Sequence, residues 1–301
     1  MSFHTNREPI ASVQGVITPL SKAMVPALDR GFLFADAVYE VLRTYKGRPF
    51  LAKGHYRRLE RSLATLRIKG VDVEGLKKRI QAVLRDGGFD EALVYIQISR
   101  GVAPRTHGFP EGIKPFEFFY VADYVDLTAP LRETGVTVSL QPDRRWGRCD
   151  TKTTNLLGNV LAYQDARDQG AYEAILYKED GTITEMTRTS FFAVKDNIIW
   201  THPSGPRILP SITKDLVFEI CEKIGQPIRS QAIPLKDLME FDEMFMAGTT
   251  SEIIPIIGVD GKPVGKGTIG PVTMALRNGF MDHLNHWLGH PDDEIEGDFS
   301  D

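Results

Sequence analysis

The sequence predicts an α+β or α/β protein of two lobes. The chain has 301 residues, close to the length at which one hydrophobic core divides into two. Short runs rich in β-branched and aromatic residues alternate with helical patterns along the chain. We expect an N-terminal α+β domain over 1–125, a linker over 126–135, a C-terminal domain over 136–290 and an acidic tail over 291–301.

The N-terminal half is predicted to contain several strands and two helices. Leucines at helical spacing predict a helix over 55–68. A second helix over 73–85 is expected to stop at a pair of glycines. Alternating or β-branched and aromatic residues indicate strands over 13–18, 37–45, 92–99, 116–124 and, at the start of the next domain, 136–140.

The C-terminal half is predicted to combine hairpin-like strands with three helices. A helix over 211–224 begins at Ser211, a favourable N-cap, and a closing helix covers 272–288. The expected strands cover 172–177, 183–187 and 190–194, with a turn at 179–181, and strand and turn continue through 243–263. The tail over 291–301 is nearly all acidic or small and is expected to fray. One face of a further helix, over 155–169, is marked by Leu157, Val160, Leu161 and Gln164.

Composition narrows the possible partners and the cellular compartment. The formal net charge is −4 and no segment forms a basic stripe, which argues against nucleic-acid and membrane partners. The two cysteines, Cys149 and Cys221, form neither a disulfide framework nor metal-ligand spacing, so we expect reduced thiols and no metal site. Because no leader and no apolar run of about 18 residues is evident, we expect a cytoplasmic protein.

Two residues suggest cofactor chemistry. Lys152 lies in Asp150-Thr151-Lys152-Thr153-Thr154, and Glu185 ends Gly181-Thr182-Ile183-Thr184-Glu185. An amine that can form an imine and a carboxylate that can hold a ring nitrogen protonated are the minimum equipment for pyridoxal phosphate chemistry. Two solvated surface charges are the alternative interpretation of such a pair taken alone.

Several separated motifs favour the chemical interpretation. In their order along the chain and in their residues, the motifs resemble those of the fold-type IV pyridoxal phosphate enzymes, the class IV aminotransferases. They are most similar to those of the bacterial D-amino acid transaminases. The resemblance covers roughly residues 10–285 and implies pyridoxal 5′-phosphate held between two lobes, with the C-terminal domain binding the cofactor. Besides the lysine segment, the motifs are Gly31-Phe32-Leu33-Phe34-Ala35-Asp36-Ala37-Val38-Tyr39-Glu40, His55-Tyr56-Arg57-Arg58-Leu59, Arg105-Thr106-His107, Thr184-Glu185 and Gly248-Thr249-Thr250-Ser251-Glu252.

The resemblance implies a cofactor site. Lys152 matches the catalytic Schiff-base lysine, and Glu185 matches the residue bonded to the pyridine nitrogen. Arg58 matches the phosphate arginine, whereas Arg57 beside it would face away along the helix. Leu209 matches an apolar side chain against the cofactor ring. Further phosphate contacts are implied for Ile212 and Thr213 at a helix N-terminus and for Gly248 and Thr249 in a second loop.

The resemblance also implies a substrate site and a homodimer. Tyr39, Arg105 and His107 match the trap for the substrate α-carboxylate, and in the family the Arg-x-His loop reaches across from the neighbouring subunit. Thr250 matches a residue beside the substrate. Arg188 departs from the family pattern. It is a second carboxylate receptor that favours dicarboxylates, a neutralising partner for Glu185, or an ordinary solvent-facing charge.

The implied reaction is ping-pong transfer of an amino group from a D-amino acid to a 2-oxo acid, for example from D-alanine or D-glutamate to 2-oxoglutarate or pyruvate. A branched-chain L-amino acid or amine transaminase is one alternative, since it shares Lys152, Glu185 and Arg58. An aminodeoxychorismate-lyase-like enzyme that eliminates pyruvate is another. A non-catalytic cofactor carrier is the remote option.

Overall fold

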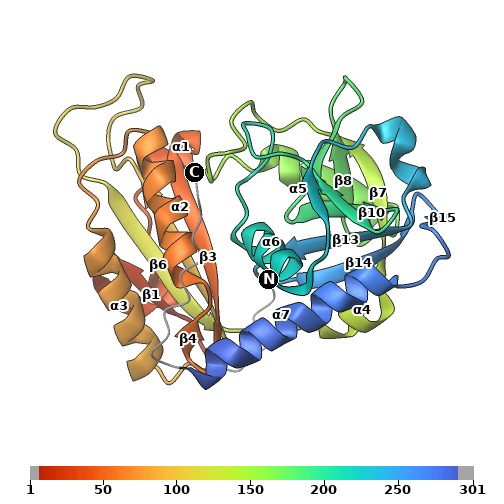
Figure 1. Cartoon of the computed structure of the whole chain (residues 1–301). Coiled ribbons are helices and arrows are strands. Elements are labelled where there is room, and N and C mark those ends of the chain that lie inside the picture. Colours follow the sequence, from red (N-terminus) through yellow and green to blue (C-terminus); the bar gives the residue numbers. More distant parts are fainter. Residues whose placement is uncertain (1–6, 291–301) are drawn as a thin grey trace. The chain divides into compact units, whose positions relative to one another are not determined.

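The computed structural model describes residues 7–290, and the chain divides into two compact units (Figure 1). The N-terminal unit contains the described residues up to Val125 together with Thr151–Asn155. The C-terminal unit contains Asp126–Asp150 and the described residues from Leu156 onward. The short segment that carries Lys152 therefore belongs to the N-terminal unit, although most of its sequence neighbours belong to the other.

The N-terminal unit is built on a six-stranded sheet in the order β2-β1-β6-β5-β3-β4, with every neighbouring pair antiparallel. Two long helices, α2 and α3, cover one face of this sheet (Figure 1). The strands are β1 (Ile10–Val13), β2 (Val16–Pro19), β3 (Ala37–Tyr45), β4 (Arg48–Pro49), β5 (Ala92–Ser99) and β6 (Phe116–Asp123). The helices are the 3-10 turn η1 (Leu20–Lys22), α1 (Arg30–Phe34), α2 (Ala52–Thr65) and α3 (Val73–Asp86).

The core of this unit explains why its helices form where they do. Leu59 of α2 and Leu76 and Ile80 of α3 are fully buried in one cluster with Leu42 and Phe119 of the sheet. These residues stand at helical and strand periodicity, so folding removes one apolar stripe of each helix from water. Three tyrosine rings also stack across β3, β5 and β6. The centroid distances are 5.9 Å for Tyr39–Tyr95 and 5.3 Å for Tyr95–Tyr120.

The C-terminal unit is built on a nine-stranded mixed sheet in the order β12-β11-β10-β13-β14-β7-β8-β9, with β15 paired to β14. Its core contains Ile175, Phe191, Met246 and Ile254 of this sheet in one buried cluster. The strands are β7 (Val136–Pro142), β8 (Ala174–Tyr177), β9 (Ile183–Met186), β10 (Ser190–Lys195), β11 (Ile198–Thr201), β12 (Ile228–Ser230), β13 (Glu243–Gly248), β14 (Glu252–Val259) and β15 (Lys262–Pro263). The helices are α4 (Ala129–Thr134), α5 (Leu157–Asp168), α6 (Ile212–Ile224), the 3-10 helix η2 (Leu235–Glu240) and α7 (Pro271–Gly289).

Most predicted elements are confirmed, and the differences have local causes. The prediction of one strand over 13–18 is wrong, because Gln14 and Gly15 adopt φ values of 51° and 81° and turn the chain into the β1–β2 hairpin. The helix expected over 55–68 begins earlier and ends at Thr65. Residues 126–135, expected to be a linker, include the short helix α4. The elements η1, α1, β4, β11, β12 and η2 were not predicted.

Helix α5 differs from expectation in the face that it buries. Its marked apolar side chains Leu157, Val160 and Leu161 remain 67%, 57% and 57% exposed. The small residues Ala162 and Ala166 are buried instead and join a cluster with β8. Among the described residues of this unit, no element therefore covers the apolar stripe of α5.

Three general expectations concern the chain as a whole. Within residues 7–290, no helix is both long and apolar enough to cross a membrane. In the same range, no group of three or more His, Cys, Asp or Glu side chains could hold a metal ion. Cys149 and Cys221 are buried thiols that form no disulfide. The expected frayed tail lies outside the described residues.

Candidate active site

Lys152 is held in the N-terminal unit by backbone contacts on both sides. Its carbonyl accepts the N–H of Tyr39 at 3.0 Å, and its own N–H donates to Ser62 Oγ at 3.2 Å. The next residue, Thr153, forms an isolated β-bridge with Val38. The Lys152 Nζ lies 4.3 Å from the centroid of the Tyr39 ring. The fold thus brings the predicted catalytic lysine next to one predicted substrate residue.

Arg58 lies on α2, where a buried carboxylate fixes its orientation. Its Nε and Nη2 donate to the two oxygens of Glu40 at 2.7 and 2.8 Å, a bidentate pair. His55 Nδ1 lies 2.8 Å from Glu40 Oε2. Burial raises the pKa of Glu40, but Arg58 and His55 outweigh burial, so the pKa of Glu40 lies well below its usual range. Arg57 is exposed, as its helical position predicts.

Glu185 is buried on β9 and shares its cation with another carboxylate. It accepts a charged hydrogen bond from Arg145 and the N–H of Leu209, the latter at 3.0 Å. Arg145 also pairs with Asp143 at 2.8 Å, and Lys178 reaches Asp143 at 3.2 Å. Burial raises the pKa of Glu185 above its usual value, and Arg145 with the Leu209 N–H only partly opposes this. The contacts of Glu185 therefore do not fully offset the cost of burying its negative charge.

Asp143 behaves in the opposite way although it uses the same arginine. Burial raises its pKa, but hydrogen bonds from Arg145 and Thr184 outweigh burial and lower the pKa of Asp143 to about 2. Asp143 and Glu185 thus share the single positive charge of Arg145. An added cationic N–H group beside Glu185 would find an acceptor whose charge is not yet balanced.

The N-terminus of α6 carries Ile212 and Thr213, both buried. Ser211 is the N-cap, and its side chain accepts the N–H of Lys214 at 3.2 Å. The first N–H groups of a helix have no partner inside the helix, which makes this end suitable for an anion.

The second predicted phosphate loop follows β13 in the same unit. Gly248, Thr249 and Thr250 are partly buried, and Ser251 donates its N–H to the Gly248 carbonyl at 3.1 Å, which closes a tight turn. A Cβ at Gly248 would lie 3.0 Å from Thr189 Cγ2, so the glycine allows this close approach. The Thr250 carbonyl accepts the hydroxyl of Thr128 at 3.2 Å.

Arg105 and His107 are exposed on the loop between β5 and β6. The structure brings both to one aromatic ring. The Arg105 guanidinium lies 5.1 Å from the centroid of Phe34, and the His107 ring lies 5.7 Å from the same centroid. The two side chains therefore contact the same ring.

Arg188 follows β9 and is 47% exposed at its side chain. Its ion-pair partner is Glu173, which is fully buried, at 3.4 Å. The Arg188 guanidinium also lies 4.5 Å from the Tyr163 ring centroid. Glu185 is paired with Arg145 instead, so the structure gives no support to Arg188 as the neutralising partner of Glu185.

Sequence reasoning missed four groups that surround these side chains. Glu40 and His55 belong to the quoted motifs but were given no role. A lone glutamate in an apolar strand is the signal that could have indicated a buried ion pair. Arg145 had no recognisable signal. Lys214 is a buried amine, and burial lowers its pKa to about 8, against the opposing effects of Glu185 and Asp215.

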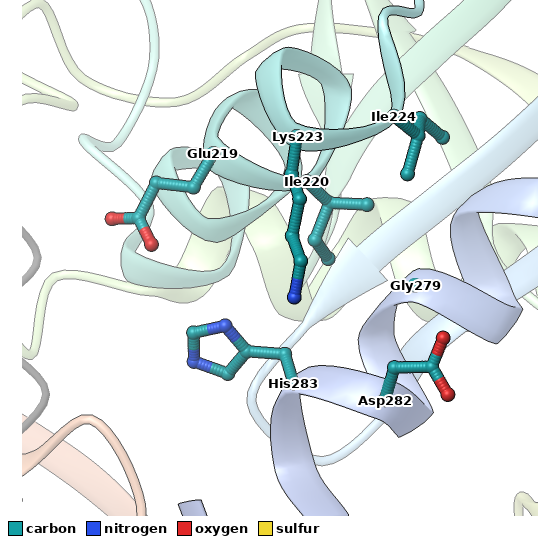
Figure 2. A pocket seen from close by; sticks show the side chains of 7 residues that line it. All are labelled: Glu219, Ile220, Lys223, Ile224, Gly279, Asp282 and His283. Carbon is teal, nitrogen blue, oxygen red and sulfur yellow. The ribbon is translucent and has the colours of Figure 1, made fainter. Parts of the chain in front are cut away.

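A small groove lies elsewhere in the C-terminal unit, between α6 and α7 (Figure 2). Lys223 of α6 extends toward the ring of His283 on α7, and Ile220 and Gly279 form the inner wall (Figure 2). None of its lining residues is among the predicted site residues. The groove is therefore separate from the candidate active site.

Sequence comparisons identify relatives along most of the chain. The family model described as amino-transferase class IV matches residues 37–259. The D-alanine aminotransferase of Staphylococcus haemolyticus is 36% identical over 278 residues, which cover 90% of this chain and 96% of that protein. The D-alanine aminotransferase of Bacillus licheniformis is 35% identical over 279 residues, which cover 90% of this chain and 95% of that protein.

Solved structures show the same fold. The branched-chain amino acid aminotransferase of Escherichia coli superposes with a TM-score of 0.86 at 25% identity, over 92% of this chain and 94% of that chain. A hypothetical aminotransferase of Mycobacterium tuberculosis in its PLP-bound form gives a TM-score of 0.78 at 19% identity, over 91% of this chain and 99% of that chain. The family resemblance predicted from the motifs is confirmed, and the chain belongs to the class IV aminotransferases.

Proposed function

We propose that this chain is a pyridoxal 5′-phosphate-dependent transaminase that moves an amino group from a D-amino acid to a 2-oxo acid by a ping-pong route. The observation that carries the proposal is the convergence of Arg105 and His107 on the Phe34 ring in a chain with Lys152 beside Tyr39. The similarity to D-alanine aminotransferases over 90% of the chain supports the same substrate class.

The chemistry of the predicted site residues fits the cofactor. When bound, pyridoxal phosphate supplies an aldehyde that links to amines and a ring that accepts electrons. Glu185 would hold the proton on the ring nitrogen, and the raised pKa that Arg145 only partly opposes suits a cationic partner. Leu209 would contact the ring. Ile212 and Thr213 at a helix N-terminus, Gly248 and Thr249 in a loop, and Arg58 of the N-terminal unit would bind the phosphate.

Lys152 performs the proton transfer. Its amine would hold the cofactor and, once released by the amino group of the substrate, would accept the proton from the substrate Cα. Tyr39 and Ser62 keep this segment in place through the two backbone hydrogen bonds. Because one amine serves one face of the substrate, the direction of the carboxylate sets the stereochemistry.

The substrate carboxylates are bound by positive and polar side chains. Tyr39, Arg105 and His107 bind the α-carboxylate, and Thr250 lies beside the substrate. Arg188 binds a distal carboxylate such as that of D-glutamate. Its partial exposure and its pairing with the buried Glu173 support this role, because the guanidinium is held in place yet reachable.

The active form is a homodimer in which the loop with Arg105 and His107 is shared across the interface. Exposed apolar side chains next to the loop support this assembly: Leu28 is 49%, Phe32 74% and Val102 40% exposed. The Leu28 carbonyl accepts the N–H of Ala103, so these side chains adjoin the loop. Sedimentation should give twice the mass of one chain, and a monomer with full activity would exclude the shared loop.

We also infer a cytoplasmic location. Its support is the pair of buried thiols, Cys149 and Cys221, neither of which forms a disulfide. Fractionation of cells that produce the protein should recover it in the cytoplasm, and recovery from a secreted fraction would contradict the inference.

A branched-chain L-amino acid transaminase is the second candidate, favoured by the fold similarity to such enzymes. Half-reactions followed at the cofactor absorbance separate the two candidates. D-alanine and D-glutamate should convert the aldehyde form to the amine form, whereas L-leucine and L-valine should not. Conversion by the L-amino acids alone would overturn the D-specific proposal.

A further inference from the structure

The loop that carries Arg105 and His107 leaves the sheet through a narrow neck. Gly101 has φ = +123°, and a Cβ there would lie 2.1 Å from the Lys114 carbonyl oxygen. Only glycine fits such a close crossing of two backbones. The Arg30 N–H donates to the Gly101 carbonyl at 3.0 Å. The neck fixes where the loop starts and ends, while its outer part needs other contacts.

Two arginines supply those contacts. Arg30 Nη1 donates to the Thr106 carbonyl at 2.6 Å, directly between the two site residues. The Arg100 guanidinium lies 3.6 Å from the centroid of the Phe109 ring, and its Nη2 donates to the Leu66 carbonyl at 2.7 Å. The two arginines thus hold the outer loop on both sides of His107.

One carboxylate joins the two arginines. Asp36 accepts Arg30 Nε at 2.8 Å and Arg100 Nε and Nη2 at 2.8 and 2.9 Å. The side chains of Arg30 and Arg100 are only 4% and 8% exposed. Two buried guanidinium groups that bond to the same carboxylate would repel each other without its negative charge. Asp36 therefore determines whether both can reach the loop.

We propose that Asp36 is a positioning residue for the α-carboxylate site, because it holds Arg30 and Arg100 where they set the backbone of the loop that presents Arg105 and His107. This inference rests on the proposed function of that loop. Phe34 completes the arrangement, since its ring contacts Arg105 and also lies 4.9 Å from the Arg30 guanidinium.

The first test compares substrates with and without the carboxylate, using the cofactor-loaded protein. In Asp36→Asn, kcat/KM for D-alanine should fall about tenfold through KM, while kcat/KM for D-alaninamide should stay within about twofold. The control Asp86→Asn, which changes an exposed aspartate paired with Arg85, should alter neither value. Equal losses for both substrates, or no change in KM for D-alanine, would overturn the proposal.

The second test needs no activity. Hydrogen exchange of the amides in 102–109 should become at least about tenfold faster in Asp36→Asn, with the β3 amides unchanged. Unchanged loop exchange would overturn the positioning role. If Asp36→Asn does not fold, Phe34→Leu should raise KM for D-alanine in the same selective way, and a KM equal to wild type would count against the proposal.

A separate variant distinguishes failure of the underlying function. Arg105→Ala should raise KM for D-alanine more than Asp36→Asn does. If Arg105→Ala leaves that KM unchanged, the proposed α-carboxylate site is wrong, whatever the exchange rates of the loop.

Discussion

The two units each contain a buried glutamate beside an arginine, and the two pairs behave differently. In the N-terminal unit, Glu40 receives two hydrogen bonds from Arg58 and lies 2.8 Å from His55. In the C-terminal unit, Glu185 shares Arg145 with Asp143. Burial is the largest influence on both, yet the pKa of Glu40 falls while the pKa of Glu185 rises.

The difference lies in the number of carboxylates that each arginine serves. Arg58 gives a bidentate contact to one glutamate, and together with His55 this contact outweighs desolvation. Arg145 makes a bidentate contact with Asp143 and also pairs with Glu185, so one cation serves two carboxylates. The comparison indicates that Glu40 orients an arginine, whereas Glu185 is suited to an additional cationic partner such as a protonated ring nitrogen.

The largest expected effect follows from removing the charge of Glu185. In Glu185→Gln, single-turnover rates with D-alanine should fall about 1,000-fold at saturating cofactor, because the ring nitrogen loses its partner. Stopped-flow absorbance measures this. Glu40→Gln is the matched control, and an equal rate loss in both variants would remove the distinction between the two glutamates.

A smaller effect concerns stability and should show the opposite ranking. In the cofactor-free protein, Glu40→Gln should lower the free energy of unfolding by about 3 kcal/mol, since Arg58 is left buried without its charge partner. Glu185→Gln should lower it much less, because Arg145 keeps Asp143. Urea titration of both variants provides the comparison. A larger loss in Glu185→Gln would show that Arg145 depends on Glu185.

The smallest effect is the pH dependence of stability in the cofactor-free protein. The folded-state pKa of Glu185 lies above 4.5, so its contribution to stability is present below 4.5 and is lost as the pH rises through the folded pKa. The folded-state pKa of Glu40 lies below 4.5, so its contribution is present above 4.5 and is lost as the pH falls.

Unfolding free energies measured across this range should therefore move in opposite directions for the two variants. Relative to wild type, Glu185→Gln should gain stability as the pH rises from 4.5 through the folded-state pKa of Glu185. The loss of unfolding free energy in Glu40→Gln, relative to wild type, should become smaller as the pH falls below 4.5. Parallel pH profiles for the two variants would contradict the opposite shifts.

Local sequence signals predicted much of the fold. The strands over 37–45 and 92–99 match β3 and β5, because runs of apolar and β-branched residues determine such strands directly. The β1–β2 turn was missed because Gln14 carries little turn signal, and its positive φ is imposed by the pairing of the two strands. Exposure of the apolar stripe on α5 also depends on tertiary context.

The candidate site was predictable only where a motif carried it. The motifs identified Lys152, Glu185 and Arg58, but their partners come from distant parts of the sequence. Arg145 reaches Glu185 across 40 positions, and Glu40 reaches Arg58 across 18. Such pairings depend on sheet order and on which side chains are buried together, which one sequence does not reveal.

The central claim is that Lys152, and not the buried amine of Lys214, holds the cofactor. Borohydride reduction of the cofactor-loaded protein, followed by peptide mass analysis, tests it directly, because reduction fixes the cofactor to the lysine that carries it. The account predicts the label on the peptide that contains Lys152, in wild type and in Lys214→Gln. A label on Lys214, or on any other lysine, would contradict it.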